Sequence, residues 1–264
     1  MIPLTAGNTR VKEARKLHRR SVRTERRCFL ADGPKAVEGA LGTVLASGQD
    51  CVVEVFATPA AASEYADLLG AAPLTLVDDR AMSGLSDSVS PAGLVAVCRF
   101  LDAPQPTAPR LLTICADVRD PGNAGTVIRT TDAAGGDAVV LAGDSVDPYN
   151  PKTIRATVGS LFHLPVGVER DAAAAVRAAQ AAGLTVLAAD GAGEVELFTP
   201  AADELLARPT AWLFGNEAWG LPDELAALAD HRVRIPILGA AESLNLATAA
   251  AVCLYASARA MMNG

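Results

Sequence analysis

Strand-like and helix-like segments alternate along residues 110–264, and this alternation restricts the possible folds more than any other feature of the chain. Short runs of Val, Ile and Leu predict buried strands, and Ala-rich stretches between them predict helices. Strands separated by helices form a mostly parallel sheet, because each parallel connection needs a crossover. We expect strands over 110–116, 138–142, 164–168, 184–189, 212–214 and 232–238, and helices over 124–134, 171–182 and 244–262.

A proline-rich segment over 101–109 separates this region from the first 100 residues. Its three prolines exclude a helix and stiffen the chain. In the first 100 residues, strands are expected over 28–31, 51–57, 74–77 and 93–100, with helices over 34–47 and 59–69. We therefore predict a small α/β domain at 1–100, a linker at 101–109 and a larger, mostly parallel α/β domain at 110–264.

The charge of the chain is unevenly distributed. Residues 1–27 hold nine Lys or Arg against two Glu, although the whole chain has a formal net charge of −7. Such a basic segment favours a polyanion such as RNA or DNA, and a solvated helix face is the alternative. The candidate contacts in this segment are Arg10, Lys12, Arg19, Arg20 and Arg23.

The composition limits the cellular compartments and the kinds of chemistry that fit this chain. The five cysteines are scattered, mostly in apolar runs, which predicts reduced thiols in a cytoplasmic protein. Met1 precedes a polar, basic segment rather than a signal core, and no apolar stretch is long enough to span a membrane. The three histidines lie far apart and no Cys-x-x-Cys occurs, so we expect no metal site. Glycine fingerprints of nicotinamide enzymes and phosphate-binding loops are absent from the sequence.

Polar loops follow three of the predicted strands, at the edge where parallel sheets bind ligands. The first places Asn123 where it can cap the next helix, with Arg129 six residues further along. The second, over 215–221, is bounded by glycines and carries Glu217. The third follows a strand that contains Pro236, which must lie at a sheet edge or leave the sheet there.

Each loop also fits an ordinary structural role. The first is then a capped helix with an exposed arginine, and the second is a simple turn with Trp219 packed in the core. The third, which ends in Ser243 and Asn245, is then a helix cap.

The order and spacing of these segments resemble one family. Asn-x-Gly-x-x-x-Arg-Thr lies at 123–130, Gly-x-Glu-x-x-Gly-Leu at 215–221, and Ile-Pro followed by Ser-Leu-Asn at 235–245. Together with the stretch 150–162, they resemble the SpoU/TrmH branch of the SPOUT RNA methyltransferases over about residues 110–260. Residues 27–35 are more loosely similar to the substrate-binding domain that precedes this core in members that modify ribosomal RNA, with Asp32 where Glu is commoner.

The resemblance implies transfer of a methyl group from S-adenosylmethionine to a ribose 2′-hydroxyl of RNA. It also implies a deep trefoil knot and a homodimer in which Arg129 of one chain faces the cofactor of the other. Arg129 would accept the hydroxyl proton or hold an RNA phosphate, with Asn123, Glu217, Ser243 and Asn245 around it. The implied cofactor contacts are Leu213, Gly215, Asn216, Ile235, Ile237, Leu244 and Asn245. Arg155, in the stretch 150–162, joins the candidate RNA contacts.

The resemblance favours a 2′-O-methyltransferase of 23S ribosomal RNA. Methylation of tRNA is one alternative, and a non-catalytic RNA-binding or ribosome-assembly factor on the same fold is another. A small-molecule enzyme on an ordinary doubly wound fold is disfavoured by the basic segment and the missing glycine fingerprint.

Overall fold

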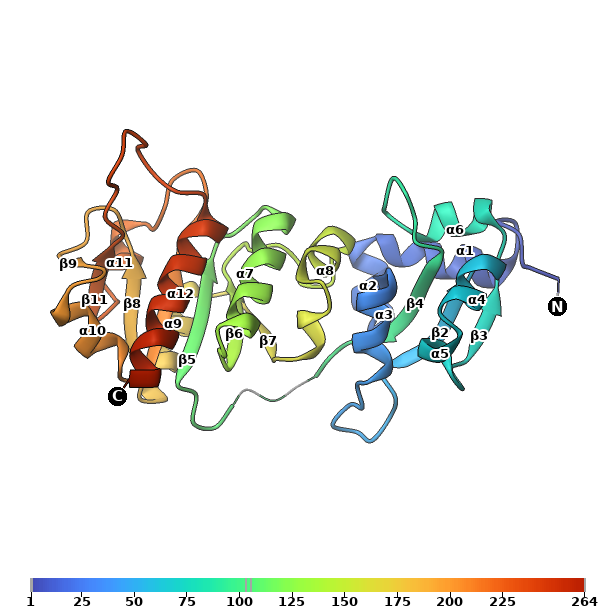
Figure 1. The fold of residues 1–264 in the computed structure, drawn as a ribbon, viewed down its shortest axis with the longest axis horizontal. Helices are drawn as coiled ribbons and strands as arrows, with labels where there is room; N and C mark the ends of the chain where they lie inside the picture. Colours follow the sequence, from blue (N-terminus) through green and yellow to red (C-terminus); the bar gives the residue numbers. More distant parts are fainter. Residues whose placement is uncertain (1, 103, 105, 264) are drawn as a thin grey trace. The chain divides into compact units, whose positions relative to one another are not determined.

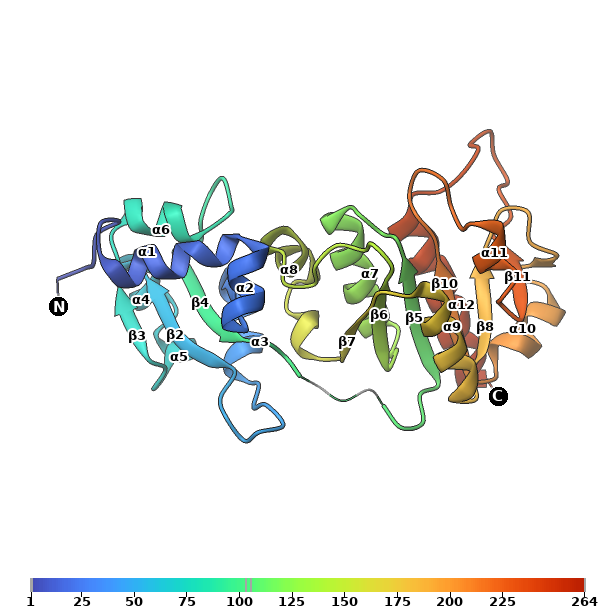
Figure 2. The same cartoon turned by 180° about the vertical axis from the view of Figure 1, so that it is seen from behind.

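The computed structural model describes residues 2–102, 104 and 106–263, and it divides into two compact units (Figures 1 and 2). The N-terminal unit comprises residues 1–103 together with 149–163, and the C-terminal unit comprises 104–148 and 164–264. The predicted linker over 101–109 includes Ala103 and Gln105, which lie outside the described residues.

A four-stranded mixed sheet forms the centre of the N-terminal unit. Its order is β1 (Cys28–Asp32), β4 (Leu94–Arg99), β2 (Val52–Ala57) and β3 (Leu74–Leu76). Strand β4 is antiparallel to both neighbours, whereas β2 and β3 are parallel. The connecting helices are α3 (Pro34–Leu41), α4 (Pro59–Glu64), α5 (Ala66–Leu69) and α6 (Asp79–Leu85). The small α/β architecture predicted for this region is therefore present.

Two helices of this unit differ from the prediction. The helix expected over 34–47 ends at Leu41, because the chain turns at Gly48 (φ +79°) and pairs Val44 with Asp50. The helix expected over 59–69 is divided at Tyr65, whose dihedral angles leave the helical range.

The basic N-terminal segment is helical and belongs to the core of its unit. It forms α1 (Thr9–Arg15), a 3₁₀ turn over Lys16–His18, and α2 (Arg20–Arg26). Val11, Ala14 and Leu17 are buried, and they pack with Leu30 and Phe56 of the sheet. Burial of this apolar stripe fixes the segment and leaves most of its basic residues on the outer face.

Residues 149–163 pack with the N-terminal unit, although they lie between two strands of the C-terminal sheet. They form α8 (Pro151–Thr157) and a 3₁₀ turn over Ser160–Phe162. The rings of Tyr149 and Phe162 stack on buried Phe29, with centroids 4.7 and 6.1 Å away. A Cβ at Gly39 would lie 2.7 Å from the Phe162 ring, so only glycine allows this approach. The N-terminal unit therefore includes residues 149–163, whereas the predicted boundaries at 100 and 110 placed them in the C-terminal domain.

A seven-stranded sheet forms the centre of the C-terminal unit, and every strand pair in its described residues is parallel. Its order is β7 (Val166–Glu169), β6 (Ala138–Ala142), β5 (Leu111–Ala116), β10 (Thr210–Phe214), β8 (Thr185–Ala189), β11 (His231–Arg234) and β9 (Val195–Glu196). The predicted mostly parallel α/β fold is confirmed. Strand β11 ends before Pro236, so the chain leaves the sheet at that point.

Helices cover both faces of this sheet (Figure 1). One face packs against α7 (Pro121–Ala133), α10 (Pro200–Leu206) and α12 (Leu246–Asn263). The other packs against α9 (Ala172–Ala181) and α11 (Asp223–Ala226). Trp212 and Phe214 of β10 belong to the first core and Leu213 to the second, because successive side chains of a strand point to opposite faces.

Candidate active site

Residues 117–120 link strand β5 to helix α7, which carries the first of the predicted site residues. Asp120 is its N-cap, since the carboxylate accepts a hydrogen bond from the backbone N–H of Asn123 at 2.7 Å. Pro121 takes the first helical position. The prediction that Asn123 caps the helix is wrong, because aspartate followed by proline already supplies the start. Asn123 lies in the first turn, and its side chain bonds to other loops instead.

The loop after β10 is held closed by its own backbone. Asn216 and Gly220 exchange two backbone hydrogen bonds of 2.9 Å. A Cβ at Gly215 would lie 2.3 Å from the carbonyl carbon of Gly220, so a larger residue would force the loop apart. The buried Asn216 side chain donates to the carbonyl oxygen of Asp117 at 2.6 Å, which ties this loop to the end of β5. The result is a rigid turn that presents Glu217.

Three predicted side chains meet in what we call the strand-end network (Asn123, Glu217 and Asn245). Glu217 Oε1 accepts hydrogen bonds from Asn123 Nδ2 and from the Asp120 backbone N–H, both at 3.2 Å, and its Oε2 accepts from the Arg119 N–H at 3.4 Å. Asn245 Nδ2 donates to Asn123 Oδ1 at 3.1 Å, while its own Oδ1 caps α12. One network thus joins all three predicted loops.

A cavity of about 360 Å³ lies beside this network and includes Glu217 in its wall. Ligand pockets commonly have this size. Phe214, Ile235 and other apolar residues form part of the lining. The lining also contains three carboxylates, Asp190, Glu217 and Glu242, and no Lys, Arg or His. The cavity therefore suits a ligand that combines an apolar part with positive charge.

The cavity collects most of the side chains predicted to hold a cofactor. Its lining includes the predicted contacts Gly215, Asn216, Ile235, Ile237 and Leu244, as well as Ser243. Leu213 and Asn245 are not among the lining residues: the Leu213 side chain is buried in the core on the α9 face, and Asn245 bonds to Asn123.

Asp190 and Glu242 are lining residues that the sequence reasoning missed. Asp190 directly follows the end of β8, so the position of ligand sites at strand ends was a signal that could have found it.

Arg129 lies on the exposed surface of α7, six residues beyond Asn123. Its side chain makes no hydrogen bond or ion pair with any residue that the structure describes. Since a solvent-exposed guanidinium is a ready partner for phosphate, this position is compatible with RNA contact. Its catalytic role stays a prediction.

The candidate RNA contacts divide into exposed and occupied residues. Lys12, Arg19 and Arg20 are exposed. Arg10 forms an ion pair with Glu54. Arg23 is only 2% exposed, and its guanidinium donates to the backbone carbonyl oxygens of Leu17 and His18 at 2.9 Å. The prediction that Arg23 contacts RNA is therefore wrong, because this side chain is used inside the fold.

Arg155 is partly exposed on α8 and lies close to two carboxylates. Its guanidinium is 3.8 Å from Asp32 and 3.5 Å from Asp87. These ion pairs offset the charge that the side chain would offer to RNA, and its role stays a prediction.

Trp219 does not pack in the core, contrary to the structural alternative for its loop. Its side chain is 54% exposed, and the Arg119 guanidinium lies over the ring, 5.2 Å from the centroid. Arg119 is a third residue that the sequence reasoning missed, although its place in the loop after β5 was an available signal.

Cys115 lies at the end of β5, near the network. Burial, with a smaller contribution from the Glu217 carboxylate, raises the pKa of its thiol to about 12. The thiol stays protonated at neutral pH, so nucleophilic thiolate chemistry does not occur here. The other cysteines are free thiols, and all but Cys28 are buried.

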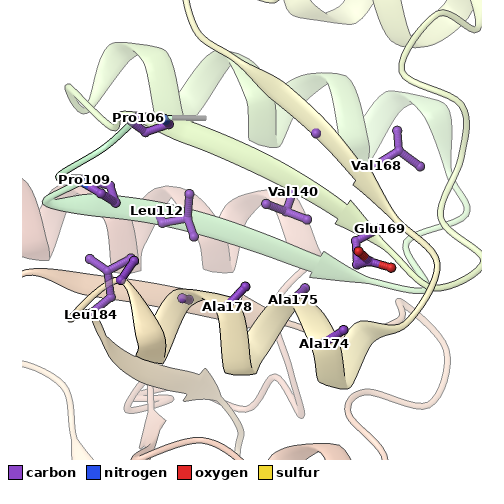
Figure 3. A pocket seen from close by; sticks show the side chains of 13 residues that line it. Pro106, Pro109, Leu112, Val140, Val168, Glu169, Ala174, Ala175, Ala178 and Leu184 are labelled. Atoms are coloured by element: carbon purple, nitrogen blue, oxygen red, sulfur yellow. The ribbon is translucent and has the colours of Figure 1, made fainter. Parts of the chain in front are cut away.

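A second cavity, of about 260 Å³, lies on the α9 face of the sheet (Figure 3). Alanines of α9 face Leu112 and Val140 across it. Among its lining residues only Glu169 carries a charge, and none has a hydroxyl or amide side chain. This groove offers few groups that could orient a polar substrate, so we place the candidate site at the strand-end network.

The described residues hold neither a candidate metal site nor a candidate membrane-spanning helix. They contain no cluster of three or more His, Cys, Asp or Glu side chains that could hold a metal ion. None of their helices combines the length and apolar character needed to cross a bilayer.

A parallel α/β unit whose strand-end loops enclose a partly apolar, acidic cavity defines an enzyme-like domain that binds its ligand at the carboxyl edge of the sheet. Residues 110–255 match the model of the SpoU rRNA Methylase family, and residues 8–96 match that of the MRM3-like substrate binding domain. The chain belongs to the SpoU rRNA Methylase family.

Individual relatives agree with this assignment. The 23S rRNA (guanosine(2553)-2′-O)-methyltransferase RlmP of Bacillus subtilis (strain 168) is 35% identical over 95% of this chain and 96% of its own length. An AdoMet-bound rRNA methyltransferase from Sinorhizobium meliloti matches with a TM-score of 0.81 and 32% identity, covering 98% of this chain and 97% of that one. The SpoU methyltransferase AviRb from Streptomyces viridochromogenes, in complex with AdoMet, matches with a TM-score of 0.81 and 27% identity, covering 97% and 99%.

The predicted membership of the SpoU/TrmH branch is thus confirmed, as is the N-terminal resemblance to a substrate-binding domain. The trefoil knot that the resemblance implies stays a prediction.

Proposed function

We propose that this chain transfers a methyl group from S-adenosylmethionine to a ribose 2′-hydroxyl of large-subunit ribosomal RNA. The observation that carries the proposal is the strand-end network, which joins three loops beside an acidic cavity. The name of the Bacillus relative, which aligns over nearly its whole length, supports ribosomal RNA as the substrate and the ribose as the acceptor. An enzyme that methylates 23S ribosomal RNA would act in the cytoplasm.

The residues of the cavity fit S-adenosylmethionine. The carboxylates of Asp190, Glu217 and Glu242 suit a ligand that carries positive charge on its sulfonium and amino groups. The partly exposed side chains of Ile235, Ile237 and Leu244 provide apolar surface for a flat base. Two of the solved relatives hold this molecule, which supports the same cofactor here.

When bound, the cofactor supplies a methyl group that is already activated as part of a sulfonium. The ribose 2′-oxygen would take this methyl group, S-adenosylhomocysteine would be the leaving group, and the hydroxyl proton would pass to solvent. The protein must therefore hold the ribose in line and assist loss of the proton.

The chain's own residues divide this work. Glu217 already accepts three N–H donors, so we assign it to positioning the loops rather than to proton transfer. An exposed guanidinium presents planar donors that fit a phosphate, so we assign Arg129 to holding an RNA phosphate and polarising the hydroxyl. Lys12, Arg19 and Arg20 extend the phosphate contacts on the N-terminal unit.

We further propose that the protein works as a homodimer, with Arg129 of each chain acting at the partner's cofactor. Two observations support this arrangement. Arg129 has no partner among the described residues of its own chain. Neighbouring α12 exposes Tyr255 and combines it with small residues such as Ala251, which suits close packing of helices.

The proposal is tested by cofactor binding and by mapping of the product. Calorimetry should show S-adenosylmethionine binding without added metal, in competition with S-adenosylhomocysteine. Ribosomal RNA from cells lacking the gene should lack one 2′-O-methyl group, and the purified protein should restore it. If the purified protein methylates tRNA but not ribosomal RNA, then tRNA is the substrate. If the protein binds no S-adenosylmethionine in any condition, it is a non-catalytic RNA-binding factor.

A further inference from the structure

The two tryptophans of the chain have opposite environments. Trp212 is fully buried and donates from its indole nitrogen to Ser257 Oγ at 2.9 Å. Trp219 is 54% exposed, although it lies two residues from Glu217 in a chain with few aromatic side chains. A single exposed apolar side chain is common on protein surfaces, so the inference depends on what surrounds this ring.

Trp219 is paired with a cation that can also contact phosphate. The Arg119 guanidinium lies 5.2 Å from the ring centroid, and it forms a long ion pair of 3.9 Å with the highly exposed Asp144. The Arg119 backbone N–H bonds to Glu217 Oε2. The pair is therefore fixed to the strand-end network, while both side chains stay accessible.

The loop that carries Trp219 is rigid. Ala218 donates its N–H to the Asn216 side chain at 2.8 Å, and Gly220, with φ +71°, closes the backbone onto Asn216. The neighbours on both sides of Trp219, Ala218 and Gly220, line the cofactor cavity, whereas Trp219 itself does not. An aromatic surface held at the border of the cavity loses little entropy when a flat group stacks on it.

We propose that Trp219 and Arg119 form a stacking platform for an unpaired RNA base next to the ribose that receives the methyl group. The inference rests on the proposed function, which places a ribose at the adjacent cavity. RNA recognised at single nucleotides presents unstacked bases, and these stack on aromatic rings and on arginine planes. A guanidinium beside the ring adds a partner for the flanking phosphate, so the chemistry of the pair matches a nucleotide.

Tryptophan fluorescence tests the contact directly. A single-stranded RNA dodecamer should quench the emission of Trp219, whereas buried Trp212 gives a constant background. The quenching should disappear in Trp219→Phe. An abasic ribose-phosphate oligomer of equal length should bind without quenching, because it lacks the base. Equal quenching by both oligomers would overturn the platform, since charge alone would then explain the signal.

Kinetics on large-subunit ribosomal RNA from cells lacking the gene test its use in the reaction. Trp219→Ala should lower kcat/KM by roughly 5- to 150-fold, the range expected for loss of one stacked base. Trp219→Phe should recover part of the rate, and S-adenosylmethionine affinity should not change in either variant. Phe198→Ala, which removes an aromatic side chain of similar exposure (57%), is the matched control and should behave as wild type.

Two outcomes separate the platform from the proposed function. If the wild type methylates RNA, and Trp219→Ala shows the same quenching by RNA and the same kcat/KM, the platform fails and the proposed function stands. If the wild type transfers no methyl group to RNA while the dodecamer still quenches Trp219, the proposed function fails and an RNA-binding platform stands. A change in the sedimentation of Trp219→Ala would assign the ring to a protein interface and overturn the proposal.

Discussion

Glu217 shows how much of this site depends on one side chain. Its carboxylate accepts hydrogen bonds from the Arg119 and Asp120 backbones and from the Asn123 amide. Two of these donors are backbone N–H groups at the start of α7, where a helix favours negative charge. The carboxylate therefore holds the loop after β10 against the loop after β5, in the wall of the cavity.

Arg129 allows the clearest test at the scale of one residue. Arg129→Ala should reduce single-turnover methylation by roughly 10²- to 10⁴-fold, the usual contribution of assistance to proton transfer. Cofactor affinity, measured by calorimetry, should stay unchanged, because Arg129 does not line the cavity of its own chain.

Arg129→Lys separates two roles for this side chain. Lysine keeps the charge but loses the planar fork, so partial recovery of the rate indicates phosphate placement. Inactivity equal to that of alanine indicates that the guanidinium geometry is essential. Near-normal turnover of Arg129→Ala with saturating RNA and cofactor would contradict both roles.

At the scale of elements, the helices α1 and α2 combine a structural face with a charged face. Replacing Lys12, Arg19 and Arg20 by alanine should weaken RNA binding and flatten its salt dependence. Each lost phosphate contact should change the slope of log affinity against log salt by roughly 0.7–0.9. The measurement is a salt titration of RNA affinity.

Arg23→Ala is the matched control for this helix. Its guanidinium bonds to two backbone carbonyls inside the unit, so the substitution should cost about 1–3 kcal/mol of stability. The salt slope should not change. Two results would contradict the division into a structural face and a charged face. One is a flattened salt slope in Arg23→Ala, and the other is an unchanged slope in the triple variant.

The loop over 215–220 gives a second test at this scale. Gly215→Ala places a methyl group against the Gly220 backbone and should lower S-adenosylmethionine affinity by at least about tenfold, because the loop must open. Gly239→Ala is the control, since nothing lies within 4 Å of its added Cβ. Calorimetry measures both affinities, and equal affinities would show that the closed loop is not needed for the cofactor.

At the scale of the whole molecule, the chain passes between its two units three times, because residues 149–163 return to the N-terminal unit. This segment is fixed there by Tyr149, which stacks on Phe29 and Phe100, with the Phe100 centroid 4.0 Å away. The N-terminal unit is therefore incomplete without a segment from the middle of the chain.

Complementation between two impaired chains tests the proposed dimer, at a cofactor concentration too low to load Gly215→Ala. Arg129→Ala retains its cavity, and Gly215→Ala retains its arginine. If Arg129 acts at the partner's cofactor, a mixed dimer of the two contains one complete site. Random mixing should then restore roughly a quarter of the wild-type activity, measured with separately tagged, coexpressed chains. No recovery in verified mixed dimers would show that Arg129 acts within its own chain.

The sequence by itself determined the elements and their order. Strand and helix positions follow from local apolar patterns, and all ten predicted strands are present within a few residues. The polar loops after β5, β10 and β11 could also be predicted, because glycine, proline and capping residues act over a few positions. The family resemblance then linked these loops before any geometry was known.

Only the tertiary structure decided which side chains meet and which are exposed. Asn123 lies 94 residues from Glu217 and 122 from Asn245, so no local pattern specifies their hydrogen bonds. The burial of Arg23 and the exposure of Trp219 depend on what packs against them, and both reversed the simple expectation from residue type. Residues 149–163 belong to the N-terminal unit because their aromatic rings stack on Phe29. This contact links segments more than 100 residues apart.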